Sequence, residues 1–412
     1  MQFVAKAGCY AVIAVLVAVF GFAGTGVAGT SVVAAGVSDV PDAGPTFDGT
    51  VLTIAYANGV AYVGGEFSSA RSAGKAYPRS RLAAIDTRTG ALLPWAPTAD
   101  GTVLALAVDA GTVYLGGDFG YVNGLHRDGV AALTAATAGG TASASGTGPT
   151  GGTGPASGTS PVGGVVTGFK HAVSGQPRSF AIAAGRLYVG GRLTMVDGVP
   201  VANLAAFTLA TGALVPAWVP ATDEPVDALA ADATRVYAGG TFHTVDGVPA
   251  RKLAALDQVS GTLDTSFAAK VDVRVYAIAT GPDGIYAALG GTGGRVRSYA
   301  ADGTERWAAT TDGDVQAVTY LSGVVYLGGH FDNACRSGAV GDHGLCLDGA
   351  VSRIKLAAVD AGTGTLLPWN PQGNGITGVD VLAADPVLGK VAAGGAFTTI
   401  GGVTRQRYAQ FG

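Results

Sequence analysis

The sequence predicts an all-β fold built from seven copies of one structural unit. Its composition is the first reason: 67 of the 412 residues are glycine, 48% are hydrophobic and only 13% are charged, which suits short buried strands joined by tight turns. The second reason is an internal repeat. A Tyr-x-Gly-Gly string or a close variant recurs along the chain, with copies beginning at Tyr62, Tyr114, Tyr188, Tyr237, Tyr286, Tyr326 and Val391.

Each unit is predicted to contain four short antiparallel strands. In the second unit, residues 103–108, 113–119 and 130–133 form the first three strands, and Asn123 and Gly124 form a tight turn because both tolerate a positive φ. The fourth strand carries one aromatic side chain in each unit, which we expect to pack between neighbouring units. These aromatic residues are Phe47, Trp95, Phe169, Trp218, Phe267, Trp307 and Trp369.

A large ring at the same position of every unit indicates radial repetition, so the predicted fold is a seven-bladed β-propeller of four-stranded antiparallel blades. Residues 408–412 match a third strand, which leaves the last blade without a fourth strand. Residues 45–51 match the approach to a first strand, and Phe47 supplies the seventh aromatic residue. We therefore expect an N-terminal strand to complete the last blade and close the ring, which leaves no long exposed edge.

The first 35 residues are predicted to be a secretory signal peptide. A positive charge precedes the apolar run 9–22, and small residues follow it up to two candidate cleavage positions, after Ala28 and after Ala35. An uncleaved N-terminal segment is the alternative, and it would be the chain's contact with a membrane. Residues 36–412 are then expected to form a single propeller domain at the cell surface or outside the cell.

Two insertions are predicted to interrupt the repeats. Residues 138–164 lie between the third and fourth strands of the second blade and consist almost wholly of Gly, Ser, Thr, Ala and Pro. Because they offer little apolar area for packing, we expect a flexible surface insertion. Residues 332–352 lie between the second and third strands of the sixth blade and contain two cysteines.

These two cysteines, Cys335 and Cys346, are the ones that remain once the signal peptide is removed. Two cysteines in one surface insertion of an exported protein most often form a disulfide, which is our prediction. The alternative is a zinc site, because His330, Cys335, His343 and Cys346 have a spacing that could supply ligands. An oxidising compartment disfavours the thiolates that zinc would need, so no metal is expected.

Arginine recurs three residues before the third strand in four of the units. These residues are Arg79, Arg127, Arg353 and Arg405. Since all loops between second and third strands emerge on one face of a propeller, the arginines are expected to form a partial ring there, beside Asn123 at a turn tip. One interpretation is a face that binds an anionic or polyhydroxyl ligand through guanidinium groups. The alternative is that each arginine pairs with an Asp of the neighbouring blade and only holds the ring together.

The repeated string resembles a known family. Val-Tyr-x-Gly-Gly-x-Phe followed by Val-Asn/Asp-Gly, Leu-Ala-Ala-x-Asp, Thr-Gly and Pro-Trp is similar to the bacterial delta-60-repeat β-propellers, a domain family of unknown function, over residues 45–412. That resemblance implies an extracellular or cell-surface propeller. A weaker likeness, in residues 84–95, is to the repeats of quinoprotein dehydrogenases, but the spacing to Trp95 is one residue too long.

The sequence favours a non-catalytic binding or scaffold protein. A net charge of −4 argues against nucleic-acid binding, and no motif for a nucleophile, a phosphate loop or a calcium loop is present, so no catalytic residue and no cofactor is predicted. The expected partner is an extracellular ligand, a glycan or a protein, bound by a monomer. The alternatives are an enzyme, either a quinone-cofactor dehydrogenase or a carbohydrate-active enzyme, and a purely structural display module.

Overall fold

The described residues form an all-β structure. The computed structural model describes residues 36–138 and 163–412, and the regular elements there are β-strands apart from one short 3-10 turn, Asp342–Gly344. The predicted all-β class is therefore confirmed. The predicted signal peptide, residues 1–35, lies outside the described residues, and so does the insertion predicted at 138–164 apart from its ends. No helix in the described ranges is long and apolar enough to cross a membrane.

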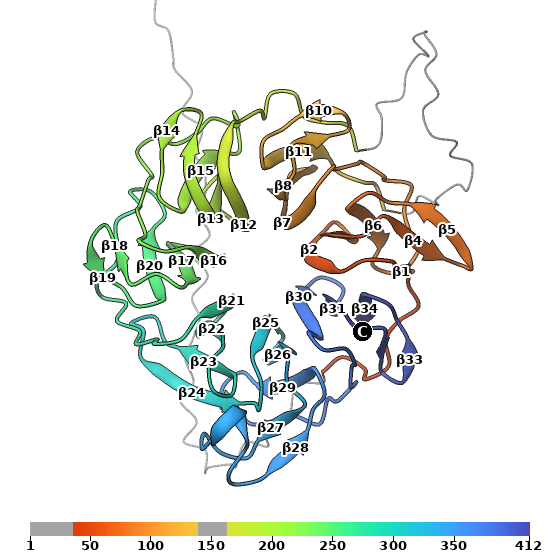
Figure 1. Ribbon diagram of the computed structural model, residues 1–412, viewed down its shortest axis with the longest axis vertical. Coiled ribbons are helices and arrows are strands. Elements are labelled where there is room, and N and C mark those ends of the chain that lie inside the picture. Colours follow the sequence, from red (N-terminus) through yellow and green to blue (C-terminus); the bar gives the residue numbers. More distant parts are fainter. Residues whose placement is uncertain (1–35, 139–162) are drawn as a thin grey trace, which may run out of the picture. The chain divides into compact units, whose positions relative to one another are not determined.

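Seven antiparallel sheets of the described chain follow one another around a common centre, and each begins with a hairpin (Figure 1). The first strands, which lie nearest the centre, are β2 (Val51–Ala57), β7 (Thr102–Asp109), β12 (Val173–Ala183), β16 (Val226–Ala231), β21 (Val275–Gly281), β25 (Val315–Leu321) and β30 (Val379–Asp385). The second strands are β3 (Val60–Gly65), β8 (Thr112–Asp118), β13 (Arg186–Val196), β17 (Arg235–Gly240), β22 (Gly284–Leu289), β26 (Val324–Gly329) and β31 (Lys390–Gly395). The third strands are β6 (Leu82–Asp86), β11 (Val130–Thr134), β15 (Leu204–Thr208), β20 (Leu253–Asp257), β23 (Arg295–Tyr299), β29 (Leu356–Asp360) and β34 (Tyr408–Phe411).

A smaller outer hairpin joins the second and third strands in six of the seven sheets, and in the sixth sheet it carries the cysteine-containing insertion. Asn123 and Gly124 have the positive φ expected of such a turn, +48° and +74°. The strands of these outer hairpins are β4 (Ser69–Ser72) with β5 (Lys75–Pro78), β9 (Tyr121–Val122) with β10 (Leu125–His126), the end of β13 with β14 (Val199–Pro200), β18 (Thr244–Val245) with β19 (Val248–Pro249), β27 (Asn333–Cys335) with β28 (Ala350–Ser352), and β32 (Thr399–Ile400) with β33 (Val403–Thr404).

A glycine pair in six of the seven second strands allows neighbouring sheets to pack closely, whereas β22 has Ala288 and Leu289 at these positions. A Cβ added at Gly64 would lie 2.7 Å from Cγ1 of Val103, which belongs to the first strand of the next sheet. A Cβ added at Gly65, the second glycine, would lie 2.0 Å from the carbonyl oxygen of Thr50 in its own sheet. Both distances are shorter than any real Cβ contact, so only glycine fits. The repeated Gly-Gly is therefore a packing requirement.

A β-bulge occurs at the same position of every inner strand. In β2 the register shifts between Val51 and Thr53, so the residue between them has no partner across the hairpin with β3. A bulge turns one extra side chain away from the ladder. The bulged residues are Leu52, Leu104, Arg178, Asp227, Tyr276, Gln316 and Asp380. Sequence reasoning did not predict these bulges.

The predicted fourth strand is a full strand in one sheet of the described chain, where β24 (Glu305–Thr310) pairs with β23. In five other sheets it is reduced to a single bridge, such as Ile85 with Leu92. The prediction of four-stranded blades is therefore wrong for most units. In three of them a proline follows within two residues of the bridge, at Pro94, Pro216 and Pro368, and proline has no amide hydrogen to donate to a ladder.

The predicted aromatic residues pack at equivalent sites in six units. Each ring contacts a tyrosine of the second strand in its own sheet, as Trp218 does with Tyr188 at a centroid distance of 4.8 Å. The indole nitrogen then bonds to the next sheet, where Trp218 Nε1 donates to the carbonyl of Asp257 at 3.1 Å. The six tyrosine–aromatic pairs are Tyr62–Trp95, Tyr114–Phe169, Tyr188–Trp218, Tyr237–Phe267, Tyr286–Trp307 and Tyr326–Trp369.

Phe47 was wrongly placed at the seventh of these sites. Trp95 precedes Asp100 by five residues, and Asp100 accepts backbone amide bonds from the outer hairpin of its sheet. Asp48 accepts amide bonds in the same way, so the residue equivalent to Trp95 is Ala43. Phe47 is buried instead against Phe67 and Tyr408. Phe47 is the aromatic residue nearest to this site in the sequence, but Ala43 occupies the position of the repeat that Trp95 occupies in the first unit.

The N-terminal segment contacts the last sheet, but in a different way from the prediction. The strand β1 (Thr46–Phe47) pairs with β4 of the first sheet. The residues before it follow β34, because the Ser38 amide donates to the Gly412 carbonyl at 3.3 Å and the Asp42 amide to the Gln410 carbonyl at 2.7 Å. Residues 45–51 therefore do not add a full strand to the last sheet as expected. Phe47 makes one backbone bond there, its amide donating to the Gln406 carbonyl at 3.1 Å, and the contacts along β34 are made by the earlier residues 38–42.

Replacing Trp218 by Ala should lower the free energy of unfolding by about 3–5 kcal/mol, the range for truncation of a large buried ring. The side chain is fully buried and contributes both a ring contact and an inter-sheet hydrogen bond. Urea unfolding would measure the change. The neighbouring Val219, 38% exposed, provides the control, and Val219→Ala should change stability little. Equal effects of the two substitutions would contradict the assigned packing role.

Candidate functional site

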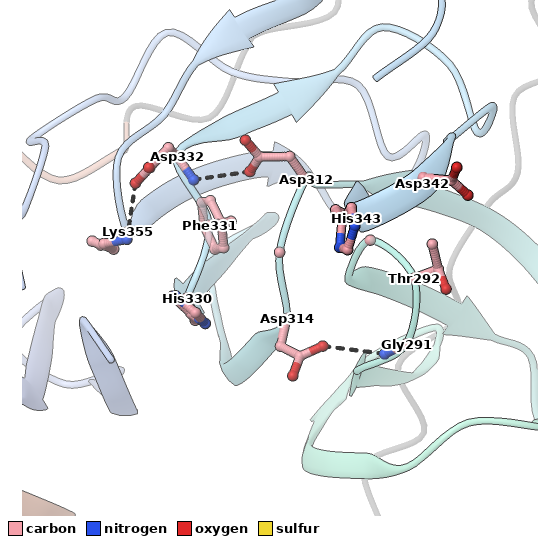
Figure 2. Close-up of a pocket in the computed structure, with 12 residues that line it drawn as sticks. Gly291, Thr292, Asp312, Asp314, His330, Phe331, Asp332, Asp342, His343 and Lys355 are labelled. Carbon is pink, nitrogen blue, oxygen red and sulfur yellow. Dashed lines mark hydrogen bonds and ion pairs between the residues drawn. The ribbon is translucent and has the colours of Figure 1, made fainter. Parts of the chain in front are cut away.

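A polar pocket of about 850 Å³ lies between loops of the fifth and sixth sheets (Figure 2). Its wall comes from the β22–β23 loop, the β24–β25 loop, the β26–β27 loop and the cysteine-containing insertion between β27 and β28. The polar side chains that line it are Thr292, Asp312, Asp314, His330, Asp332, Asp342, His343 and Lys355. Four carboxylates and two imidazoles therefore surround one opening, next to a single lysine.

Asp312 holds two loops of the pocket together. Its Oδ1 accepts the backbone amides of Asp332 and Asn333, both at 2.9 Å, and its Oδ2 accepts Nδ2 of Asn333 at 2.7 Å. Asp48, Asp100 and Asp223 make the matching amide contacts in other sheets. Asp312 is therefore a repeated structural clamp, and its carboxylate is occupied.

The same bonding pattern lowers the pKa of Asp48 and Asp223. Burial raises the pKa of Asp48, but hydrogen bonds from the Ser68 hydroxyl and from the backbone amides of Ser69 and Ser68 outweigh it, and the pKa is lowered to about 2. The pKa of Asp223 is also lowered, since amide bonds from Thr244 and His243 outweigh its slight desolvation. These carboxylates stay ionised, as a clamp on backbone amides requires.

Two further groups of the pocket are also engaged by neighbours. Asp314 accepts the Tyr276 hydroxyl at 3.0 Å and the Gly291 amide at 3.1 Å. Lys355 donates to Asp332 at 2.8 Å, and Figure 2 shows this contact and the one between Asp314 and the Gly291 amide. The lysine side chain is nearly buried while that of Asp332 is exposed. The ion pair thus fixes the lysine beneath the opening rather than presenting it to solvent.

The remaining polar side chains of the pocket are exposed and uncommitted. Thr292, His330, Asp342 and His343 are all exposed. Within the described parts of the chain, none of these side chains makes a hydrogen bond or ion pair. Hydroxyl, imidazole and carboxylate groups can together donate to and accept from a polar ligand. We call these four exposed residues the rim of the pocket. The other polar side chains of the pocket are bonded to neighbouring residues and belong to its structural frame.

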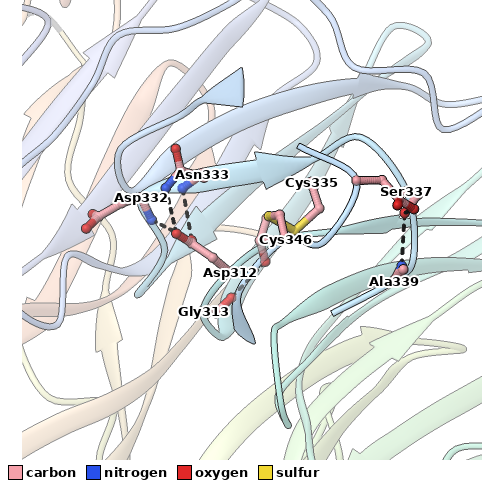
Figure 3. The surroundings of a disulfide bond; sticks show 10 residues. Asp312, Gly313, Asp332, Asn333, Cys335, Ser337, Ala339 and Cys346 are labelled. Atoms are coloured by element: carbon pink, nitrogen blue, oxygen red, sulfur yellow. Dashed lines mark hydrogen bonds between the residues drawn. A yellow bond between two sulfur atoms is a disulfide. The ribbon is translucent and has the colours of Figure 1, made fainter. Parts of the chain in front are cut away.

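The cysteine-containing insertion supplies part of this rim and is fixed in place. Cys335 and Cys346 form a disulfide across it, so the predicted disulfide is present and the zinc alternative loses both of its thiolates (Figure 3). No group of three His, Cys, Asp or Glu residues in the described ranges is placed to hold a metal ion. Gly344, with φ +81°, fits against the pocket loops, because an added Cβ would lie 2.1 Å from the Asp312 carbonyl oxygen. Asp342 and His343 are thereby held beside the opening.

The predicted arginine ring is not an exposed surface. Arg79, Arg127 and Arg353 are 5%, 5% and 8% exposed. Arg79 donates to the carbonyls of Pro78 and Leu93, at 2.7 and 2.8 Å, and Arg353 repeats the pattern with Ser352 and Leu367. The binding interpretation of these residues is therefore wrong. The alternative is right about a structural role, but the partners are backbone carbonyls rather than Asp side chains.

Two other residues of the predicted binding set also serve the frame. Arg405 donates to the Thr404 carbonyl and, at 3.1 Å, to the Asp42 carbonyl of the N-terminal segment. Asn123 accepts the Thr98 amide at 2.8 Å and donates to the Gly163 carbonyl at 3.0 Å. Both side chains connect loops. The available polar groups are instead those of the pocket between the fifth and sixth sheets, of which the sequence marked His330 and His343 as zinc candidates only.

Comparison with known proteins identifies the fold. No family model matches the chain, and no curated protein matches its sequence. Among solved structures, the chain is similar to the WD40 β-propeller domain of Doa1, with 10% identity and a TM-score of 0.52 over 90% of this chain and 96% of that one. It is also similar to the computationally designed Ika8 protein, with 13% identity and a TM-score of 0.47 over 91% and 99%. The WD40 similarity shows a β-propeller fold.

Replacing Arg79 by Ala should lower the free energy of unfolding by about 1–3 kcal/mol, because it leaves a buried carbonyl without its donor. Thermal and urea unfolding would measure the loss. Arg251→Ala is the matched control, since its side chain is 69% exposed and pairs only with the exposed Asp272. Its substitution should be nearly neutral. An Arg79 variant as stable as the Arg251 variant would contradict the structural role.

Proposed function

We propose that this protein is an exported, non-catalytic binding module that takes its ligand at the pocket between the fifth and sixth sheets. One observation carries the proposal. Most polar residues of the repeated frame, such as Asp312 and Arg79, are occupied by backbone groups, whereas those at the rim of this pocket are exposed and uncommitted. Polar groups on a rigid, disulfide-linked support are typical of a binding site. The disulfide is also compatible with an oxidising compartment.

The chemistry of the rim favours a hydroxyl-rich ligand such as a glycan. Asp342 accepts hydrogen bonds, Thr292 both donates and accepts, and the imidazoles of His330 and His343 can do either. An open pocket of about 850 Å³ is within the range for ligands of oligosaccharide size. A protein partner is the other class expected, and it would use the same rim.

Asp342→Asn combined with His343→Ala should weaken binding of any glycan found in an array screen at least tenfold, because it changes both uncommitted side chains that the insertion places on the pocket. Calorimetric titration of the purified protein with that glycan would measure it. Asp272→Asn, with a side chain 76% exposed outside the pocket, is the charge-matched control. Unchanged affinity in the double variant, with the fold intact, would place the ligand elsewhere.

We also infer that the sheets form a closed seven-bladed ring, consistent with the resemblance to the delta-60-repeat propellers. The support lies where the first and last sheets meet. A Cβ added at Gly394 of β31 would lie 2.6 Å from Cγ1 of Val51 in β2, the contact that Gly64 makes with Val103. Phe47 and Val51 share a buried cluster with Tyr408 and Ala392. Residues 38–42 run beside β34 and complete the junction.

Gly394→Ala should therefore destabilise the protein as much as Gly328→Ala, the same change at an internal junction, where Val379 lies 2.5 Å from the added Cβ. We expect about 1–3 kcal/mol for each, the usual result of overpacking. Gly168→Ala is the control, because nothing lies within 4 Å of its added Cβ. Urea unfolding would compare the variants. A neutral Gly394→Ala beside a destabilising Gly328→Ala would indicate an open array.

A further inference from the structure

A second pocket, of about 340 Å³, lies among the inner strands and is lined by residues of all seven of them. These strands surround the centre in Figure 1. The bulged residue of each strand is part of its lining, so every sheet contributes one side chain that the repeat does not need for packing. This central pocket is separate from the pocket of the proposed function, and binding in one does not depend on binding in the other.

One side of the central pocket has an excess of cationic donors. Arg178 on β12 donates to Asp227 Oδ1 at 2.6 Å, and Arg274, just before β21, donates to Asp227 Oδ2 at 2.8 Å. Two guanidinium groups thus share one nearly buried carboxylate, which leaves a net positive charge. Arg274 also lies over the Tyr276 ring, 4.6 Å from its centroid. Arg178 Nε also donates to Gln176 Oε1 at 2.9 Å, and the guanidinium still lines the pocket with N–H donors left over.

The side formed by β25 and β30 has acceptors without donors. Gln316 Oε1 is covered from solvent and has no hydrogen-bond partner in the described chain. Asp380 makes no hydrogen bond or ion pair within the described ranges. The pKa of Asp380 is raised to about 6, because burial and the nearby Glu66 carboxylate raise it more than Arg407 lowers it. A buried acceptor and a partly desolvated carboxylate are costly when unpaired, so both would gain from a cationic donor.

The rest of the bulge ring is apolar. Leu52 on β2 and Leu104 on β7 line the arc between Asp380 and Arg178. Around the centre in Figure 1, β12 and β30 are separated by β7 and β2 on one side and by three inner strands on the other. The cationic and acceptor groups therefore face each other across the pocket, with a leucine surface beside them.

We propose that the central pocket binds a zwitterionic amino acid with an apolar side chain. Its carboxylate would contact Arg178, its ammonium group would contact Gln316 and Asp380, and its side chain would lie on Leu52 and Leu104. A guanidinium suits a carboxylate because it offers donors in a planar fork. A volume of about 340 Å³ is at the lower end of the range for small-molecule pockets, which fits a ligand of this size.

The experiment uses L-leucine and two analogues, titrated calorimetrically into the mature protein at pH 7.5. N-acetyl-leucine lacks the ammonium group, and leucinamide lacks the carboxylate. We expect one leucine per chain. Asp380→Asn should weaken leucine and leucinamide at least tenfold and leave N-acetyl-leucine unchanged. Arg178→Gln should weaken leucine and N-acetyl-leucine and leave leucinamide unchanged. Lys75→Ala, in the exposed hairpin strand β5, is the control.

The pH dependence gives an independent readout. As pH falls through about 6, Asp380 gains a proton and loses its attraction for an ammonium group, so leucinamide affinity should fall in the parent protein but not in Asp380→Asn. If Arg178→Gln fails to fold, the titrations of Asp380→Asn still test the proposal, because Asn has nearly the same side-chain shape as Asp. The proposal is overturned if none of the twenty standard amino acids binds at about 10 mM, where even a millimolar site is mostly filled. Equal effects of either substitution on both analogues would also overturn it.

Discussion

The close contact between each glycine pair and the next inner strand is the constraint on which the rest of the structure depends. Gly64 receives Val103, and the same contact joins Gly328 to Val379. Because a Cβ would separate the sheets, the glycine sets how near the inner strands come to the centre. The Trp and Tyr pairs then fill the wider outer part of each junction, as Tyr62 and Trp95 do. The inner part of these junctions is therefore closely packed, and the outer part is filled by large rings.

The bulge lies beside this close approach in six sheets, and it also occurs in β21, which faces Ala288 and Leu289 instead of a glycine pair. Gly65 leaves no room between its backbone and the carbonyl of Thr50, and the inner strand gains one residue there. That residue is free of the ladder, so its chemistry can differ from sheet to sheet, from Leu52 to Arg178 and Asp380. The backbone therefore repeats from sheet to sheet, while the side chains around the centre differ. The cysteine-containing insertion is likewise a feature of one sheet only, added to the repeated backbone in a loop.

The sequence was sufficient for features that depend on local repetition. The turn residues, the aromatic register in six units and the disulfide could be predicted because each leaves a periodic or chemical mark. Phe47 was misassigned because Ala43, the true counterpart of Trp95, leaves no aromatic mark. The arginines were misread because a repeated charge looks the same whether it contacts solvent or, like Arg79, a buried carbonyl. The bulges depend on contacts between strands, which a single strand's pattern does not record.

These differences indicate where function can lie in a repeat fold. A polar residue that recurs at one register, such as Asp100 or Arg353, is committed to the frame because every unit needs the same backbone groups satisfied. A polar residue that occurs once at a variable register, such as Asp380 or His343, has no such task. Whether such a residue is buried or exposed, its polar group is not bonded to another part of the described fold. Departure from the repeat, rather than repetition, therefore marks the candidate sites of this propeller.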